Sequence, residues 1–335
     1  MNAEKVMAEG QPTLSVIVPV FNESSNVFHT AAAIAETLGK AGISYELVFV
    51  NDGSTDDTAE RIAELGRTDA TVRLTGYPAN AGRGKALRTG LAAARGQFVA
   101  TIDADLSYHP SAILDLMKAL EQNPGADFAV GSPYARGGST EGVPAFRLLV
   151  SKLGNIVLKR FMPGDFHTFT GILRCYRRPM VDRLVLDSDG KEIHLEILTK
   201  ALVLGFKGIE VPAVLTGRKR GRSKFRFRQT AVSHIVYALH AKPMAIFGLI
   251  GLAMLLVAVG MAIYLLVLSA SNIPVGGRPL LAFAVFLGIT AMLIMAIGFI
   301  ALQNVVLRNE MYKIASQNKA IADRLDKVGK DRGGQ

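Results

Sequence analysis

Short apolar runs alternate with amphipathic stretches over the first 122 residues of the chain. Residues 14–20 and 45–50 are rich in β-branched and aromatic side chains, and each run is followed by polar turn residues and then by a helical pattern. The same pattern predicts strands at 72–74 and 98–102 and helices at 27–38, from about 56, at 84–94 and at 111–122. Strands that alternate with helices predict a mostly parallel α/β sheet covered on both faces.

Two longer apolar segments follow in the C-terminal third. Residues 244–268 and 280–307 carry no charged side chain, and each exceeds the roughly 20 residues that cross a bilayer core of about 30 Å. They predict two transmembrane helices that are long enough to tilt or to enter the headgroup layer. The N-terminus is polar and its first apolar run is short, so we expect no signal peptide.

The net charge of +10 is concentrated beside the first predicted span. Residues 205–242 hold nine Lys and Arg against one acidic residue, whereas residues 1–204 hold 21 against 23. Between the spans, residues 269–279 carry Arg278 alone, and the tail 308–335 carries seven basic residues against four acidic ones. The positive-inside rule therefore predicts that both termini and the polar part of the chain are cytoplasmic.

A basic run at 218–228 contains seven cations and no acid, and it precedes a predicted amphipathic helix at 229–241. Such a run could bind nucleic acid or form a solvated face. Because it leads into a membrane span, we favour a membrane-surface platform that attracts anionic headgroups, and we expect no nucleic-acid partner.

The tail has a heptad pattern with one polar position. It predicts self-association into a homo-oligomer, the alternative being a helix that lies on its own α/β domain or on the membrane. The pattern consists of Leu307, Met311, Ile314, Asn318, Ile321, Leu325 and Val328.

Two carboxylates, Asp103 and Asp105, end the apolar run at 98–102. Open α/β sheets bind ligands at the carboxyl ends of their strands, and a pair of oxygen ligands suits Mg²⁺ or Mn²⁺, which take their other ligands from water and phosphates. An isolated pair of this kind could equally cap a turn and start a helix. The single cysteine, Cys175, excludes an internal disulfide, and we expect it in the core.

Polar clusters also follow the other predicted strands. Arg83, Lys85 and Arg88 flank a glycine-rich turn and would place cations beside a phosphate, although the glycines could simply permit the turn. Ser54 followed three residues later by Asp57 resembles a capping box, which favours helix-start roles for Asp56 and Asp57.

Four motifs stand in a fixed order along this first half: VIVPVFNE at 16–23, VNDGSTDDT at 50–58, NAGRGKALRTG at 80–90 and DADLSYHP at 103–110. Together they resemble the inverting GT-A glycosyltransferases of family 2. Four further segments, followed by two membrane spans, resemble the polyprenyl-phosphate hexose synthases, such as dolichol-phosphate mannose synthase and its bacterial glucosyl relatives. These segments are GSPYARGG at 131–138, RLLVSKLGN at 147–155, DFHTFTGILRCYRR at 165–178 and RKRGRSKF at 218–225.

The resemblance implies a GT-A nucleotide-diphospho-sugar transferase fold with a mostly parallel sheet and two C-terminal transmembrane helices. The corresponding division is a disordered N-terminus (1–12), a cytoplasmic catalytic domain (13–217), a juxtamembrane segment with an interface helix (218–242), the spans (243–307) and a cytoplasmic helical tail (308–335).

The implied reaction moves a hexose, glucose or mannose before others, from a UDP- or GDP-sugar to undecaprenyl or dolichyl phosphate with the help of Mg²⁺ or Mn²⁺. The acceptor phosphate is already an anion, so no strong general base is required, and the sequence has no evident Ser/His/Asp or Cys/His arrangement.

The resemblance also assigns site residues by position. It assigns metal binding to Asp103 and Asp105. It assigns catalysis to these two residues together with Arg147, Ser151, Arg218 and Lys224. Nucleotide-sugar binding falls to Pro19, Phe21, Glu23, Asp52, Lys85, Asp103, Ala104, Asp105 and Glu196. Lipid-phosphate binding falls to Arg136, Arg147, Ser151, Arg218, Arg222 and Lys224.

Three positions depart from the family pattern: Asn51 replaces an Asp, Ser107 replaces a metal-binding Gln, and Pro133 replaces a phosphate-binding Arg. The second suggests that water or the Ser107 hydroxyl completes the metal's ligands, and the third that Arg136 supplies the missing charge.

In the segment KEIHLEILTKAL, Glu192 and Glu196 are four apart on a predicted helix. Glu196 could meet the sugar hydroxyls or be a helix-surface charge, and His194 is expected to be packed or solvated.

Three other functions remain open at this stage. Processive polysaccharide synthases of the family carry a Q-x-x-R-W signature, and this chain has no tryptophan. A non-catalytic membrane-anchored partner of a lipid-sugar pathway would be free to lose the paired carboxylates, which are present. A family 2 transferase with another lipid acceptor is the third alternative.

Overall fold

The computed structural model describes residues 11–162, 164–217, 243–271, 273–274 and 279–333. The chain divides into two units. The first contains an α/β domain together with the chain from Lys313 onward, and the second runs from Ile235 to Tyr312. The predicted disorder at the N-terminus, the basic run and the amphipathic helix at 229–241 fall mainly or entirely outside the described residues.

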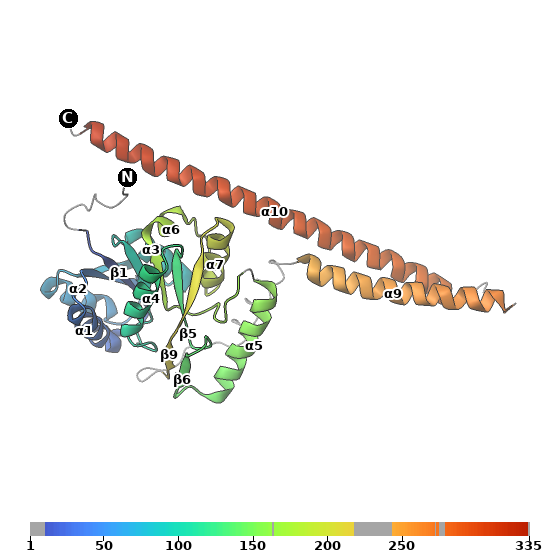
Figure 1. The fold of residues 1–335 in the computed structure, drawn as a ribbon, viewed down its shortest axis with the longest axis horizontal. Coiled ribbons are helices and arrows are strands. Elements are labelled where there is room, and N and C mark those ends of the chain that lie inside the picture. Colours follow the sequence, from blue (N-terminus) through green and yellow to red (C-terminus); the bar gives the residue numbers. More distant parts are fainter. Residues whose placement is uncertain (1–10, 163, 218–242, 272, 275–278, 334–335) are drawn as a thin grey trace. The chain divides into compact units, whose positions relative to one another are not determined.

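The α/β domain is built on one main sheet with helices around it (Figure 1). Its described strands follow the order β3-β2-β1-β4-β7-β5-β8. Strand β7 runs antiparallel to both of its neighbours, and all the other pairs are parallel, so the predicted mostly parallel α/β sheet is confirmed. A small parallel pair, β6 (Ser139–Glu141) with β9 (Val214–Thr216), stands apart from this sheet. The main strands are β1 (Leu14–Val20), β2 (Tyr45–Asp52), β3 (Val72–Tyr77), β4 (Phe98–Thr101), β5 (Phe128–Ser132), β7 (Arg174–Arg177) and β8 (Gly208–Pro212).

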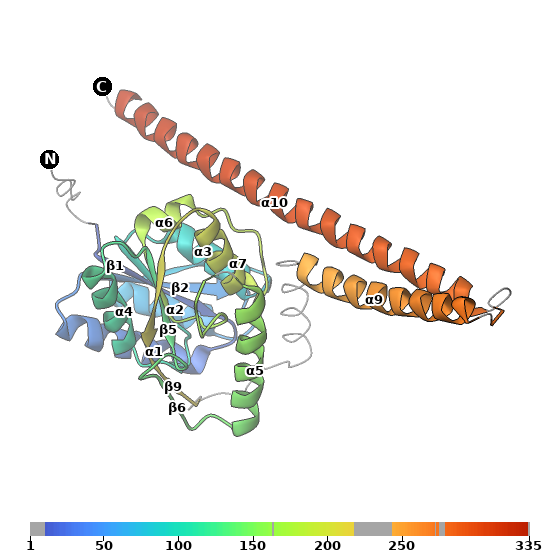
Figure 2. The same cartoon turned by 45° about the vertical axis from the view of Figure 1, so that its right-hand side comes forward.

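Helices cover both faces of the sheet because alternate side chains of each buried strand point to opposite sides (Figure 2). Val16 and Val18 pack into one core cluster with Ile34 of α1 and Ile113 of α4. On the other face, Gly90 of α3 approaches β1 so closely that a Cβ atom there would lie 2.4 Å from Cγ2 of Ile17. The helices of the domain are α1 (Ser24–Lys40), α2 (Thr58–Thr68), α3 (Arg83–Ala93), α4 (Ser111–Gln122), α5 (Ala145–Phe161), α6 (Arg178–Arg183) and α7 (Ile193–Val203).

The expected capping box at the start of α2 is wrong. Asp57 is the N-cap residue of this helix, and its carboxylate lies 2.7 Å from Nε of Arg61. The hydroxyl of Ser54 instead accepts a hydrogen bond from the backbone N–H of Asn22 at 3.0 Å. Ser54 therefore connects the loops after β1 and β2, whereas the helix-start position predicted for Asp57 is confirmed.

Cys175 lies on β7, an inner strand between β4 and β5, and has no exposed surface, as expected for a core residue. Burial raises the pKa of its thiol to about 12, so the thiol stays protonated and unreactive at neutral pH.

The second unit contains helix α9 (Pro243–Ala270) and most of α10 (Pro279–Gly333). Both helices contain windows of mean hydropathy 2.7 and are candidate membrane spans, at the positions predicted from the sequence. The second span and the predicted helical tail form one continuous helix, and the boundary between span and tail at residue 308 stays a prediction.

The tail part of α10 has two different faces. Within the first unit, the Ser316 hydroxyl donates to the carbonyl of Arg183 at 2.8 Å, and Nζ of Lys319 donates to the carbonyl of Leu184 at 2.9 Å. Ile321 and other apolar residues of the heptad pattern are exposed. Self-association through these residues stays a prediction.

Candidate functional site

The loops that follow β1 and β2 are joined at the carboxyl edge of the sheet. Asn22 adopts a positive φ of 52°, and its side-chain oxygen accepts the N–H of Thr55 at 2.7 Å. The backbone N–H of Glu23 donates to the Thr58 hydroxyl at 3.0 Å. Pro19, Phe21 and Glu23, assigned to the nucleotide by resemblance, therefore lie at or beside a loop held in one conformation by its neighbour.

Asp52 ends β2 and organises the glycine-rich turn that precedes α3. Only 5% of the residue is exposed. Its carboxylate accepts hydrogen bonds from the Tyr77 hydroxyl at 2.7 Å, the Asn80 amide at 2.9 Å, and the backbone N–H groups of Ala81 at 2.9 Å and Gly82 at 3.1 Å. Sequence reasoning assigned Asp52 to the nucleotide and missed this structural task.

The paired carboxylates lie in the turn that follows β4. Asp105 accepts a hydrogen bond from the backbone N–H of Ser107 at 3.0 Å and a second from the Ser107 hydroxyl. The carbonyl of Ala104, between the two acids, accepts a buried hydrogen bond from the Thr30 hydroxyl of α1 at 2.6 Å. The turn is thus attached to α1, and Ser107 orients one of the acids.

Three cations act on the space around Asp103. Nη2 of Arg83 lies 3.3 Å from Oδ1 of Asp103. Burial raises the pKa of the nearby Tyr108, the negative charge of Asp103 raises it further, and Arg147 opposes both effects. For Lys191, burial and then the positive charges of Arg83 and Arg147 lower the pKa, while Asp103 raises it. The site therefore combines carboxylates with a group of cations.

The other two cations of the glycine-rich motif have different surroundings. The guanidinium of Arg88 forms an ion pair with Asp189 and donates to the carbonyl of Leu186 at 3.1 Å. Nζ of Lys85 lies 4.4 Å from the ring centroid of Tyr77. Arg88 thus supports a loop, whereas Arg83 remains beside the acid pair.

Glu196 is buried, so the alternative of a helix-surface charge is wrong. Its carboxylate accepts the backbone N–H groups of Asp187 and Ser188, both at 2.9 Å, and pairs with Nζ of Lys200 at 2.5 Å. Glu192 precedes helix α7 instead of lying within it, because the helix begins at Ile193.

His194 is 2% exposed, which confirms that it is packed and excludes the solvated alternative.

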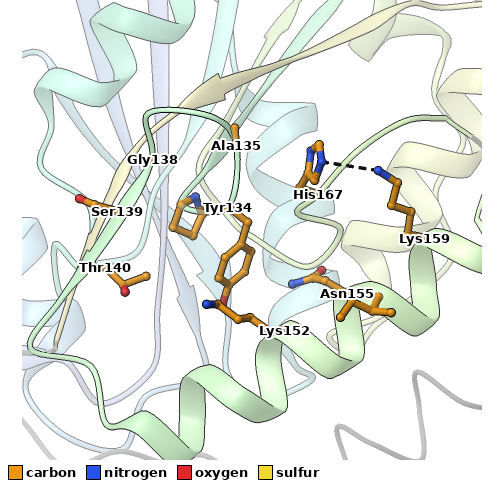
Figure 3. Close-up of a pocket in the computed structure, with 11 residues that line it drawn as sticks. Tyr134, Ala135, Gly138, Ser139, Thr140, Lys152, Asn155, Lys159 and His167 are labelled. Carbon is orange, nitrogen blue, oxygen red and sulfur yellow. Dashed lines mark hydrogen bonds between the residues drawn. The ribbon is translucent and has the colours of Figure 1, made fainter.

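A cavity of about 430 Å³ lies between α5 and the segment that joins β5 to β6 (Figure 3). Sequence reasoning missed it. One sequence signal could have predicted the helical wall of this cavity. Lys152, Ile156 and Lys159 are four and three residues apart, which puts them on one face of α5. The lining consists of Pro133, Tyr134, Ala135, Gly138, Ser139, Thr140, Lys152, Asn155, Ile156, Lys159 and His167.

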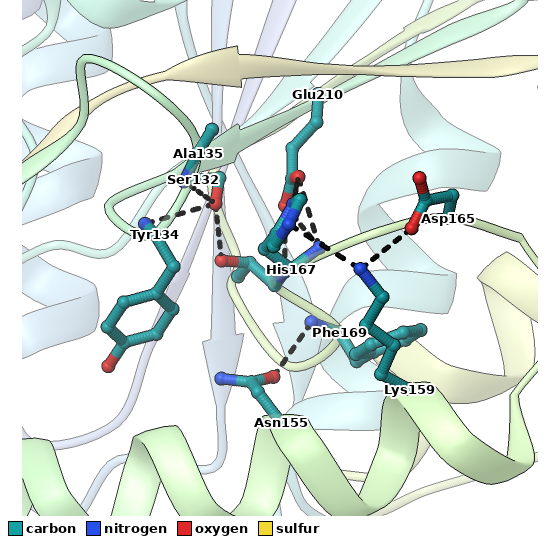
Figure 4. A network of polar contacts seen from close by, with 10 residues as sticks. Ser132, Tyr134, Ala135, Asn155, Lys159, Asp165, His167, Phe169 and Glu210 are labelled. Carbon is teal, nitrogen blue, oxygen red and sulfur yellow. Dashed lines mark hydrogen bonds and ion pairs between the residues drawn. The ribbon is translucent and has the colours of Figure 1, made fainter.

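A polar network fixes the wall of this cavity (Figure 4). Glu210 of β8 accepts the backbone N–H groups of His167 at 2.9 Å and Thr168 at 2.7 Å, and its carboxylate lies 2.8 Å from Nδ1 of His167. The Thr168 and Ser132 hydroxyls lie 2.7 Å apart, and Asn155 accepts the N–H of Phe169 at 3.1 Å. The strand residue Glu210 thus positions the loop before β7.

Helix α5 carries an apolar stripe that the domain leaves exposed. Phe146, Leu149, Leu153 and Ile156 are spaced by three, four and three residues and are 54% to 70% exposed. The helix contains four cations and no acid. Arg147 and Ser151, both assigned to the lipid phosphate, lie on this helix four residues apart.

Four other residues were assigned to the lipid phosphate by resemblance, and the structure describes one of them. Arg136 is exposed in the segment between β5 and β6. Arg218, Arg222 and Lys224 lie outside the described residues.

Among the described residues, no group of three or more His, Cys, Asp or Glu side chains could hold a metal ion. Asp103 and Asp105 fit an ion that takes two protein carboxylates and draws its other ligands from water and phosphates, as Mg²⁺ and Mn²⁺ do. The residues present are compatible with such an ion and not with a closed, all-protein metal site.

Residues 15–185 match the model of glycosyl transferase family 2. The chain belongs to this family. It is 33% identical over 217 residues to a dolichol-phosphate mannosyltransferase of Pyrococcus furiosus, covering 64% of this chain and 59% of that protein. It is 32% identical over 216 residues to a polyprenol monophosphomannose synthase of Mycolicibacterium smegmatis, covering 62% of this chain and 79% of that protein.

Solved structures agree on the fold. Glucosyl-3-phosphoglycerate synthase from Mycobacterium tuberculosis, in complex with Mn²⁺, uridine diphosphate and phosphoglyceric acid, matches with a TM-score of 0.52 at 21% identity, covering 68% of this chain and 78% of that chain. A crystal structure described only as that of a mycobacterial protein matches with a TM-score of 0.53 at 22% identity, covering 69% of this chain and 74% of that chain. The domain therefore has a GT-A-like α/β fold.

Proposed function

We propose that this protein is an inverting glycosyltransferase that moves a hexose, most simply glucose or mannose, from a nucleoside-diphosphate sugar to a polyprenyl phosphate. The product would be a polyprenyl monophosphate sugar. The observation that carries the proposal is the ion pair between Arg83 and Asp103, in the same turn as Asp105, at the carboxyl edge of a GT-A-like sheet. The names of the two curated relatives, a dolichol-phosphate mannosyltransferase and a polyprenol monophosphomannose synthase, support the lipid acceptor.

The reaction brings two polyanions together, and this sets the protein's task. A phosphate oxygen of the lipid attacks the anomeric carbon of the sugar, the bond from that carbon to the diphosphate oxygen breaks, and the nucleoside diphosphate leaves with the electron pair. Because the attacking phosphate is already anionic, no side chain has to remove a proton. Arg83 and Arg147 would neutralise phosphate charge and hold the two reactants in line.

Asp103 and Asp105 would hold Mg²⁺ or Mn²⁺. Such an ion supplies positive charge that stabilises the departing diphosphate. The hydrogen bonds from Ser107 to Asp105 keep that carboxylate oriented, and Thr30 keeps the turn between the two acids in place. The Mn²⁺ in the complex of the mycobacterial synthase supports this assignment by fold alone.

The membrane side of the proposal rests on α5, α9 and α10. The apolar stripe of α5 is made of four exposed side chains at helical spacing, and the cations of the same helix suit an anionic lipid surface. With two candidate spans and an excess of Lys and Arg before the first, we place the catalytic domain (13–217), the juxtamembrane segment (218–242) and the tail (308–335) on the cytoplasmic side.

A transfer assay tests the proposal. Purified full-length protein is incubated with undecaprenyl phosphate, Mg²⁺ or Mn²⁺, and a panel of labelled UDP- and GDP-sugars. We expect one sugar to enter the organic phase in a form that mild acid releases. Nucleotide binding without transfer of any sugar in the panel, under conditions where a known synthase is active, would contradict the proposed activity.

A further inference from the structure

The loop between α6 and α7 is held by hydrogen bonds to Glu196 of α7 and to Glu192 just before that helix. Both backbone N–H groups at Asp187 and Ser188 are bound by the buried carboxylate of Glu196, and the carboxylate of Glu192 accepts the N–H of Gly190 at 3.1 Å. Since Glu196 belongs to helix α7, these bonds attach the loop to a regular element. Lys191 stands in this loop, directly after Gly190.

The same loop packs against the glycine-rich turn beside the acid pair. The carbonyl of Asp189 accepts the N–H of Gly84 at 2.7 Å. A Cβ atom at Gly84 would lie 2.3 Å from the carbonyl oxygen of Ser188, so only glycine permits this approach. Arg83 precedes Gly84 in the chain. The contact therefore brings the loop that carries Lys191 close to Arg83, 108 positions earlier in the sequence, and Arg83 itself pairs with Asp103.

Several charged side chains act on Lys191. Lys191 is exposed, and the positive charges of Arg83 and Arg147 act on it together with the negative charge of Asp103. Three cations from separate elements repel one another, and the single negative charge of Asp103 offsets only part of this repulsion, so the space that they share favours a further anion. Burial of the side chain is the main cause of the lowered pKa of Lys191, the positive charges of Arg83 and Arg147 lower this pKa further, and Asp103 opposes them.

We propose that Lys191 is a phosphate-binding residue of this site, and that it completes with Arg83 and Arg147 a cationic cradle for phosphoryl oxygens. This inference rests on the proposed function, because it takes a nucleoside diphosphate and a lipid phosphate as the site's anions. Either of the two could supply the phosphoryl group that Lys191 contacts. A flexible ammonium group acts as a point charge and can follow a phosphate that moves, whereas Arg83 is already directed at Asp103.

The test uses full-length Lys191→Met in detergent, with Lys191→Arg as the charge-conserving variant. Lys207→Met is the matched control, because Lys207 precedes β8 and so lies at the amino edge of the sheet, away from the site. One arm measures the affinity for UDP and for GDP in the presence of Mn²⁺, with uridine and guanosine as phosphate-free references. The other arm measures the affinity for farnesyl phosphate, with farnesol as its reference. Neither arm requires turnover.

We expect Lys191→Met to weaken one of these phosphate ligands by about tenfold to a hundredfold, as the loss of a hydrogen bond to a charged group does, and to leave the phosphate-free reference unchanged. Loss in the nucleotide arm identifies the donor diphosphate, and loss in the farnesyl phosphate arm identifies the acceptor. Lys191→Arg should retain most of the affinity. Affinities within twofold of Lys207→Met in both arms would overturn the inference. A wild-type protein that binds both ligands but transfers no sugar would instead count against the proposed function alone.

Discussion

Replacement of Asp52 by asparagine separates a structural task from a ligand-binding one. The carboxylate accepts hydrogen bonds from a phenol, an amide and two backbone N–H groups of the glycine-rich turn. Asparagine keeps the volume of the side chain but has a single acceptor oxygen, and its NH₂ group only donates. At least one donor of the turn would then face another donor at hydrogen-bond distance.

The size of the effect follows from these contacts. A hydrogen bond to a charged group contributes about 1.5–3 kcal/mol and a neutral one about 0.5–1.5 kcal/mol, so loss of the charge weakens each remaining bond by roughly 1 kcal/mol. One buried donor left without an acceptor costs a further 1–3 kcal/mol or so. Because Asn80 can rotate its amide and recover part of this, we expect a total loss of about 2–4 kcal/mol. For a domain of about 200 residues this lowers the unfolding midpoint by roughly 5–15 °C.

Thermal unfolding of the detergent-solubilised protein, followed by far-ultraviolet circular dichroism, measures this shift. The chain has no tryptophan, which removes the usual fluorescence signal. Asp115→Asn, an exposed change on α4, serves as the control. A midpoint for Asp52→Asn within about 2 °C of the control would refute the structural argument. Weakened nucleotide binding at that unchanged midpoint would favour the nucleotide role that the family resemblance implies.

Three further predictions concern the metal, acid stability and the membrane. Asp105→Ala should lower transfer by at least about a thousandfold with the unfolding midpoint preserved, and near-normal turnover would remove this residue from the metal assignment. Burial alone would raise the pKa of Glu46, but hydrogen bonds from a serine hydroxyl, a guanidinium and a backbone N–H lower it below the ordinary 4.5. The stabilisation by Glu46 is therefore present above pH 4.5 and lost as the pH falls through the lowered value, so Glu46→Gln should lower the midpoint at pH 7 and flatten its decline in acid; a decline as steep as the wild type's would contradict this. Leu149→Glu combined with Leu153→Glu should raise the KM for undecaprenyl phosphate about tenfold and leave the donor KM unchanged, whereas equal effects on both would argue against a membrane-facing stripe.

The parallel core of the fold could be predicted from local sequence patterns. Strands β1, β2 and β4 are mainly apolar runs followed by polar turn residues, and that pattern depends only on burial and turn chemistry. The ends of strands and helices were less predictable, since caps depend on partners from other loops. Ser54 is an example, because its hydroxyl accepts an N–H from the loop after β1 instead of capping α2.

The candidate site also contains some residues that local motifs identify and others whose role depends on the folded structure. The acid pair and Arg83 belong to continuous motifs and could be identified from the sequence alone. Lys191 could not, because its position depends on a contact between a loop before α7 and the turn before α3, which no local pattern encodes. Glu196 was recognised as a candidate, yet its burial and its two backbone hydrogen bonds arise only when the loop folds back on α7.

The glycine-rich turn lies at the centre of these contacts. Asp52 binds it from β2, the carbonyl of Asp189 binds it from the loop before α7, and Arg83 extends from it to Asp103 after β4. A change in any one of these partners would therefore move Arg83 relative to the acid pair. This arrangement explains why the turn has glycine at positions 82 and 84, where a Cβ atom would lie 2.5 Å and 2.3 Å from carbonyl oxygens of the same loop. Because these two glycines have no side chain, the loop before α7 can pack directly against the backbone of the turn. Elements that are far apart in the sequence therefore meet at one charged edge of the sheet.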